Sequence, residues 1–280
     1  MQFRTIVDIP ASKWEINPCE RMLFVGSCFA DNIGHRFRDE KFRATINPYG
    51  VMYNPASILH TIEHLAREEA QPFRADEAGT AVFTLGTNHV YILKETGEIV
   101  DNCQKKPQNL FEERELSIDE CADYIHRAIG IIHSHFPKVN IILTVSPIRY
   151  RKYGYHGSQL SKATLLLAVE EVVKKTNITG CGKVAYFPSY EIVNDELRDY
   201  RFYQEDMLHP SSQAVDYIFE RFADTYFSKE TIEFIKAWKP IHEAFMHRPL
   251  HPESTEYKAF LTNVKGKAKE LQHRYSALEL

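Results

Sequence analysis

Short apolar runs, each followed by a segment that looks helical, constrain this chain more than any other feature. The clearest run is Met22–Val25, which ends at Gly26 and leads into charged, helix-like residues that continue to Phe42. Apolar runs without polar alternation are typical of strands buried on both faces of a parallel sheet. Further runs of this kind lie at 81–85, 140–145 and 184–187. Strands that alternate with helices therefore predict an α/β domain whose parallel sheet is covered by helices on both faces.

The segments between these strands carry signals for the start of helices. Asn54 and Pro55 form an N-cap followed by proline at the first helical position, which predicts a helix to about Arg67. Ser117 and Glu120 have the spacing of a capping box, which predicts a helix to about His135. We also expect helices at 161–175 and 211–227, and a hairpin made by 90–93 and 98–100.

After about Thr231 the pattern is entirely helical, with interruptions at Arg248-Pro249 and His251-Pro252. We therefore expect residues 1–230 to form the α/β domain. Residues 231–280 are expected to form a helical C-terminal extension packed on or near it. The sequence does not indicate an oligomeric state.

Charge and cysteine content exclude several classes of protein. The net charge is −4 over 280 residues, so no overall basic field points to nucleic acid as a partner. No apolar run approaches the ~20 residues that a membrane-spanning helix needs. The first residues lack the apolar core of a secretory signal, so we expect a cytoplasmic protein. The 5 cysteines are widely spaced without a C-x-x-C pair, which favours reduced thiols and predicts neither a metal site nor a cofactor.

Gly26, Ser27 and Cys28 form the first candidate site. They lie where a strand ends and a helix begins, and ligands of parallel sheets bind beyond the carboxyl ends of the strands. The first backbone N–H groups of the helix would stabilise an oxyanion or a thiolate there. The structural alternative is a Cys28 that packs as a small apolar residue, with Ser27 as the helix cap.

Asp206 and His209 form the second candidate site. A carboxylate three residues before a histidine can bond one ring nitrogen, which leaves the other free to face a nucleophile. The structural alternative is a surface loop with helix-capping polar groups. A nucleophile served by such a pair is the arrangement of covalent acyl chemistry.

Four further residues are candidates for oxyanion or substrate binding. Gly50 could donate its backbone N–H and Asn88 its side-chain amide to an oxyanion. Asn102 is the rival of Asn88, because the predicted hairpin could fold it over the site. Arg149 follows a strand and could bind a carboxylate or phosphate of the substrate. Each also has a purely structural reading, as a turn residue or a surface arginine.

The run Gly26-Ser27-Cys28-Phe29-Ala30 resembles the motif that names the GSCFA family, a group of bacterial proteins. The resemblance extends over about residues 20–250. Further matching pieces are Asn47–Val51, Thr84–Thr87, Asn102-Cys103, Ser146–Arg149, Ser161–Ala163 and Tyr200–Pro210. That family is in turn similar to the SGNH, or GDSL-type, hydrolases. The resemblance implies a three-layer α/β/α, flavodoxin-like fold, and it assigns Gly50 and Asn88 as oxyanion donors and Asp206 and His209 as the catalytic pair.

The nucleophile departs from the GDSL pattern. Where those enzymes read Gly-Asp-Ser, this chain reads Gly-Ser-Cys, so Cys28 matches their serine and Ser27 their aspartate. We expect an esterase, acyl hydrolase or acyltransferase that acts on a small-molecule or carbohydrate ester, with Cys28 or Ser27 as nucleophile. The alternatives are a non-catalytic scaffold that binds a glycan or a protein, and a thiol redox protein.

Overall fold

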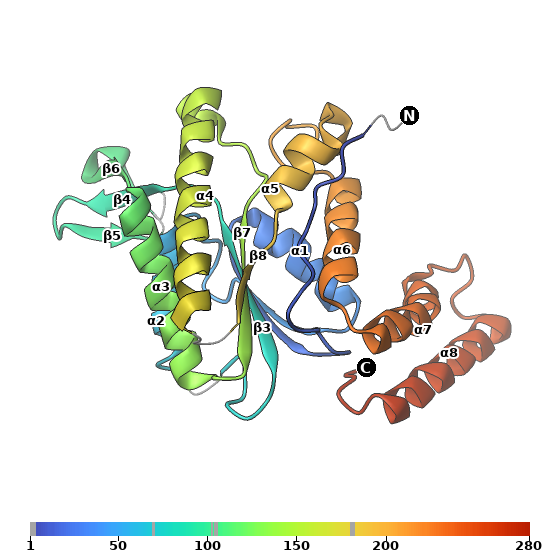
Figure 1. Ribbon diagram of the computed structural model, residues 1–280. Coiled ribbons are helices and arrows are strands. Elements are labelled where there is room, and N and C mark those ends of the chain that lie inside the picture. Colours follow the sequence, from blue (N-terminus) through green and yellow to red (C-terminus); the bar gives the residue numbers. More distant parts are fainter. Residues whose placement is uncertain (1–3, 69–70, 102, 104–105, 180–182) are drawn as a thin grey trace.

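A five-stranded parallel sheet forms the centre of the computed structural model, which describes residues 4–68, 71–101, 103, 106–179 and 183–280 (Figure 1). Its strands follow the order β2-β1-β3-β7-β8. They are β1 (Arg21–Gly26), β2 (Arg43–Ile46), β3 (Gly79–Leu85), β7 (Val139–Val145) and β8 (Val184–Tyr186). Counted within this sheet the order is 2-1-3-4-5, which is the flavodoxin-like order that the resemblance implied. The α/β prediction is therefore confirmed.

The two faces of the sheet bury alternate residues of each strand, because successive side chains of a strand point to opposite sides. In β1, Leu23 and Val25 join the core beneath α2 (Pro55–Leu65), α3 (Ile118–His135) and α4 (Gly154–Thr179). Met22 and Phe24 join the opposite core beneath α1 (Cys28–Asp39) and α6 (Ser212–Tyr226). The two groups of helices cover opposite faces of the sheet (Figure 1). The layered arrangement therefore follows from strands that are apolar on both sides.

A small antiparallel sheet is inserted between β3 and α3. It has the order β5-β4-β6 and contains β4 (His89–Leu93), β5 (Glu98–Val100) and β6 (Phe111–Glu115). The predicted hairpin is its β4–β5 pair. The third strand was not predicted, because four of its five residues are charged and only Phe111 is buried.

Shorter helical segments follow β8 and interrupt the loops. The short α5 (Ser189–Glu191) continues into a π-helical segment at Ile192–Leu197, which the sequence did not predict. Three 3-10 turns lie at Gln108–Leu110, Arg151–Tyr153 and Tyr200–Phe202. Among the described residues, no helix combines the length and apolar character that crossing a membrane requires.

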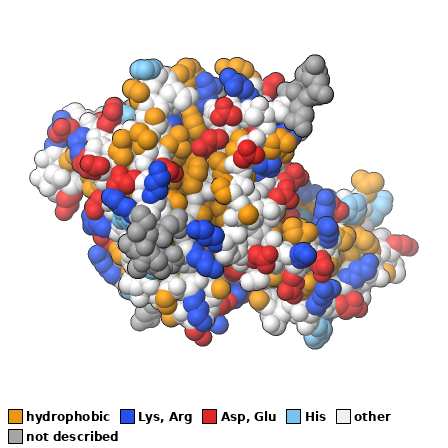
Figure 2. Space-filling model, viewed as in Figure 1, with side chains coloured by type: hydrophobic (Ala, Val, Ile, Leu, Met, Phe, Trp, Pro, Cys, Tyr) orange, Lys and Arg blue, Asp and Glu red, His pale blue; other side chains and the backbone are white. Residues whose placement is uncertain are grey.

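The chain ends in an antiparallel pair of helices, α7 (Lys229–Met246) and α8 (Thr255–Arg274). The pair has its own hydrophobic core, which includes Phe234 and Trp238 of α7. Cys19, which precedes β1, also packs into this core. The Trp238 indole Nε1–H also donates to the carbonyl of Asp39 at 2.8 Å. The two helices project from the body of the molecule, whose visible face intersperses acidic and basic side chains (Figure 2).

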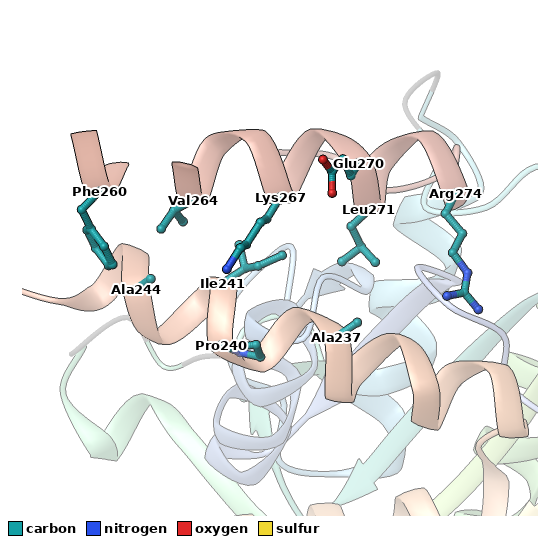
Figure 3. Close-up of a pocket in the computed structure, with 10 residues that line it drawn as sticks. All are labelled: Ala237, Pro240, Ile241, Ala244, Phe260, Val264, Lys267, Glu270, Leu271 and Arg274. Atoms are coloured by element: carbon teal, nitrogen blue, oxygen red, sulfur yellow. The ribbon is translucent and has the colours of Figure 1, made fainter. Parts of the chain in front are cut away.

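A cavity of about 390 Å³ lies between α7 and α8 and is lined mostly by apolar side chains such as Ile241 and Val264 (Figure 3). It is remote from the carboxyl edge of the sheet. Helix α6, which precedes α7, begins near that edge and leads away from it. Its 15 residues give a length of about 22 Å, which separates the start of α7 from the edge.

Candidate functional site

The turn between β1 and α1 lies at the switch point between β1 and β3. Gly26 has φ +147°, and a Cβ built there would lie 2.1 Å from the Thr84 carbonyl oxygen, so only glycine fits this turn. Ser27 is the N-cap of α1 and accepts a hydrogen bond from the backbone N–H of Phe29. Its hydroxyl also donates to Ser146 Oγ at 2.9 Å, and the residue is fully buried. Ser27 therefore joins the ends of β1 and β7 and is not accessible to a substrate.

Cys28 is the first residue of α1 and is only partly buried. Its backbone N–H lies at a helical position that has no carbonyl partner within the helix, and at the positive end of the helix dipole. Its Sγ lies 3.9 Å from the hydroxyl of Tyr53. Of the two nucleophile candidates, the structure exposes the thiol and buries the hydroxyl.

The other described thiols, Cys19, Cys121 and Cys103, are poor candidates for a nucleophile. Cys19 and Cys121 are fully buried, and burial raises their pKa to about 11 and about 12 respectively. Cys103 is partly buried, and burial again raises its pKa. Thiolate character, on which nucleophilicity depends, is therefore suppressed at these three positions.

Asp206 and His209 form the pair that their spacing predicted. His209 Nδ1 lies 2.5 Å from Asp206 Oδ2, so Nδ1 carries the proton and Nε2 is left as the basic nitrogen. The other carboxylate oxygen, Oδ1, accepts the backbone N–H groups of Leu208 at 2.8 Å and His209 at 3.0 Å. The pKa of Asp206 is lowered to about 2. The backbone N–H of His209 has the largest effect, followed by the backbone N–H of Leu208 and then the imidazole of His209. The carboxylate therefore stays ionised at neutral pH.

Arg149 attaches the loop that carries Asp206 and His209 to the edge of the sheet. It lies three residues after Ser146, and its backbone N–H donates to the carbonyl of Leu208 at 3.1 Å. Its guanidinium donates to the carbonyl of Met207 at 3.1 Å. Since Ser146 is bonded to Ser27, the ends of β1 and β7 and the His209 loop all lie along the same edge.

The guanidinium of Arg149 also forms one wall of a cavity of about 230 Å³. It lies 4.2 Å from the ring centre of Tyr155, and the rings of Tyr200 and Tyr203 lie within 5.8 Å. Arg149 follows a strand, as the sequence predicted, since β7 ends at Val145. A role in anion binding stays a prediction.

The predicted oxyanion donors make other contacts. The N–H of Gly50 donates to the carbonyl of Asn47 at 2.8 Å, within a turn that requires its φ of +94°. The amide of Asn88 donates to the carbonyl of Leu116 at 2.8 Å, and the residue is only 3% exposed. In this conformation neither group is presented to a substrate. The rival candidate Asn102 lies outside the described residues.

Lys162 is a residue of this region that sequence reasoning did not single out. It is fully buried, and its ammonium donates to the carbonyls of Gly86 at 2.6 Å and Ser146 at 2.7 Å. Burial lowers its pKa to about 7. The helical spacing of the sequence could have indicated that Lys162 is buried. It lies three residues before Leu165 and seven before Val169, on the buried side of α4.

Comparison with known proteins gives a clear family match and structural matches of low sequence identity. The model of the GSCFA family matches residues 21–77 and 69–222, and that of the GSCFA domain protein C-terminal domain matches 238–280. No curated protein matches. A carbohydrate esterase of family 3 from Talaromyces cellulolyticus is 11% identical, with a TM-score of 0.41, over 77% of this chain and 98% of its own. A second carbohydrate esterase, whose active site is described as having divergent catalytic and non-catalytic binding functions, is 14% identical, with a TM-score of 0.34. The match covers 77% of this chain and 71% of the esterase.

Proposed function

The protein belongs to the GSCFA family, and we propose that it is a thiol-dependent acyl hydrolase or acyltransferase in which Cys28, His209 and Asp206 act together. One observation carries the proposal. The carboxylate-oriented imidazole of His209 is held along the same sheet edge as the partly exposed thiol at the start of α1. Burial of the Ser27 hydroxyl and its bond to Ser146 support Cys28 over Ser27 as the proposed nucleophile.

The reaction begins when Nε2 of His209 takes the proton of the Cys28 thiol. The sulfur then forms a bond to the carbonyl carbon of the ester, and the C=O electron pair moves to oxygen. The backbone N–H of Cys28 stabilises that oxyanion. When the intermediate collapses, the bond to the alcohol oxygen breaks, and His209 returns the proton to the leaving alkoxide. Asp206 holds the imidazole in place and stabilises its charged form throughout.

The resulting thioester on Cys28 is resolved by water or by an acceptor hydroxyl. His209 removes the acceptor's proton, the acceptor oxygen attacks the thioester, and the thiolate leaves and is reprotonated. Water gives hydrolysis and a sugar or other alcohol gives acyl transfer. We propose a small-molecule ester as substrate, carbohydrate esters included, with Arg149 as the group that binds an anionic substituent on it.

The test measures turnover of p-nitrophenyl acetate by wild type and by His209→Ala, Asp206→Asn and Cys28→Ala. We expect turnover to be nearly abolished in Cys28→Ala and His209→Ala, with circular dichroism spectra like that of wild type. Ser27→Ala is the matched control for Cys28→Ala and is expected to retain the thiol chemistry. Full turnover in a folded His209→Ala variant would refute the mechanism.

A further inference from the structure

Among the described residues, the hydroxyl of Tyr53 is a polar side-chain group that lies beside the Cys28 thiol. The two atoms, Tyr53 Oη and Cys28 Sγ, are 3.9 Å apart. When a sulfur attacks a carbonyl carbon, the oxyanion forms one atom beyond the new S–C bond. A donor that effectively stabilises it lies about 2.7–3.1 Å from that oxygen, somewhat farther from the sulfur itself. The separation of 3.9 Å between the Tyr53 hydroxyl and the sulfur is compatible with this geometry.

The backbone of Tyr53 is fixed to the ends of two strands. Its carbonyl accepts the N–H groups of Gly86 at 2.9 Å and Thr87 at 2.8 Å, directly after β3. The N–H of the preceding residue, Met52, donates to the carbonyl of Gly26 at 2.8 Å, at the end of β1. The segment is therefore bonded to both sides of the switch point, and the backbone that carries the Tyr53 ring is held beside the start of α1.

The environment of the Tyr53 ring favours a donor role. The ring packs edge to face on Tyr150, with centres 6.1 Å apart, while 39% of the residue remains exposed to solvent. Burial, followed by the proximity of Cys28, raises the pKa of Tyr53 to about 12. The hydroxyl therefore keeps its proton at neutral pH.

We propose that Tyr53 donates a hydrogen bond to the oxyanion that forms when Cys28 attacks an acyl carbonyl, an inference that rests on the proposed function. The hydroxyl supplies the second donor, beside the N–H of Cys28, in the place that sequence reasoning gave to Gly50 and Asn88. Both of those groups are bonded to backbone carbonyls instead. The Tyr53 proton stays on its own oxygen, so the role is electrostatic and not acid catalysis.

The experiment compares two reactions of the same thiol in Tyr53→Phe. Acyl transfer is followed as turnover of p-nitrophenyl acetate, and alkylation as the rate at which iodoacetamide modifies the Cys28 peptide, measured by mass spectrometry. Only the first reaction develops an oxyanion. We expect kcat for the ester to fall by about 10²–10³-fold, with little change in KM, and the alkylation rate to stay as in wild type.

Tyr150→Phe is the matched control, because it removes a buried hydroxyl from the neighbouring ring and leaves the ring in place. It is expected to leave both rates unchanged. Wild-type acyl transfer in Tyr53→Phe would refute the inference alone. An equal fall in both rates would refute it too, because Tyr53 would then be acting on the thiol and not on the oxyanion. Absence of acyl transfer in wild type, with Cys28 still alkylated, would refute the proposed function and the inference with it.

Discussion

Lys162 is expected to make the stability of this fold increase with pH above neutrality. Burial lowers the pKa of its ammonium from 10.5 to about 7. Between these two values the unfolded chain binds a proton that the folded chain does not, so the free energy of unfolding rises with pH. Below pH 7 Lys162 is protonated in both the folded and the unfolded chain, so its contribution to the free energy of unfolding no longer changes with pH. For a folded pKa of about 7, the rise from pH 7 to pH 9 amounts to about 2 kcal/mol.

Urea unfolding at pH 6, 7, 8 and 9 measures this dependence in wild type and in Lys162→Met, which has a side chain of similar length and no charge. The difference between the two proteins removes the contribution of other titrating groups. We expect it to change by about 2 kcal/mol between pH 7 and 9, in favour of wild type at the higher pH. Lys174→Met, an exposed lysine on the same helix, is the control and is expected to follow wild type. A pH-independent difference between wild type and Lys162→Met would refute the reasoning.

Three further predictions concern the catalytic pair, the core and a helix cap. Asp206→Asn removes the acceptor that orients His209 and is expected to lower kcat for p-nitrophenyl acetate by up to ~10⁴-fold; a loss below tenfold would count against the pair. Phe37→Ala removes a ring that contacts five other aromatic rings, such as Phe24 and Phe222, and is expected to cost about 3–5 kcal/mol in urea unfolding; a cost under 1 kcal/mol would contradict this packing. Ser117→Ala breaks the capping box of α3 and is expected to cost about 1 kcal/mol by the same measurement, whereas Ser134→Ala, at an exposed position late in α3, serves as its control.

The sequence predicted the elements that have strong local signals. The Asn54 cap with Pro55 and the Ser117 capping box both begin helices as expected, because the contacts that define them lie within four residues. The strands at the centre of the sheet were predicted because they are apolar on both faces. The edge strand β2 was missed, since all four of its residues are only partly buried and its sequence has no continuous apolar run.

The candidate site was predicted in part, for the same physical reason. Asp206 and His209 are neighbours in sequence, so their spacing was enough to predict the hydrogen bond between them. The contacts of Asn88 with Leu116, of Tyr53 with Cys28 and of Lys162 with Gly86 join residues 25 to 76 positions apart. Such pairings depend on how the layers pack, which no local pattern encodes. The exposure of Cys28 and the burial of Ser27 likewise became visible only in the folded structure.

Acylation of Cys28 by an ester is the step on which the proposed mechanism depends, and peptide-level mass spectrometry detects it. Wild type is mixed with p-nitrophenyl acetate, quenched in acid within seconds and digested, in parallel with Cys28→Ala, Cys103→Ala and His209→Ala. We expect an acetyl adduct on the peptide that contains Cys28 in wild type and in Cys103→Ala. We expect none in Cys28→Ala and a strongly reduced yield in His209→Ala. An adduct on Ser27, or an equal yield on Cys28 with and without His209, would contradict the mechanism.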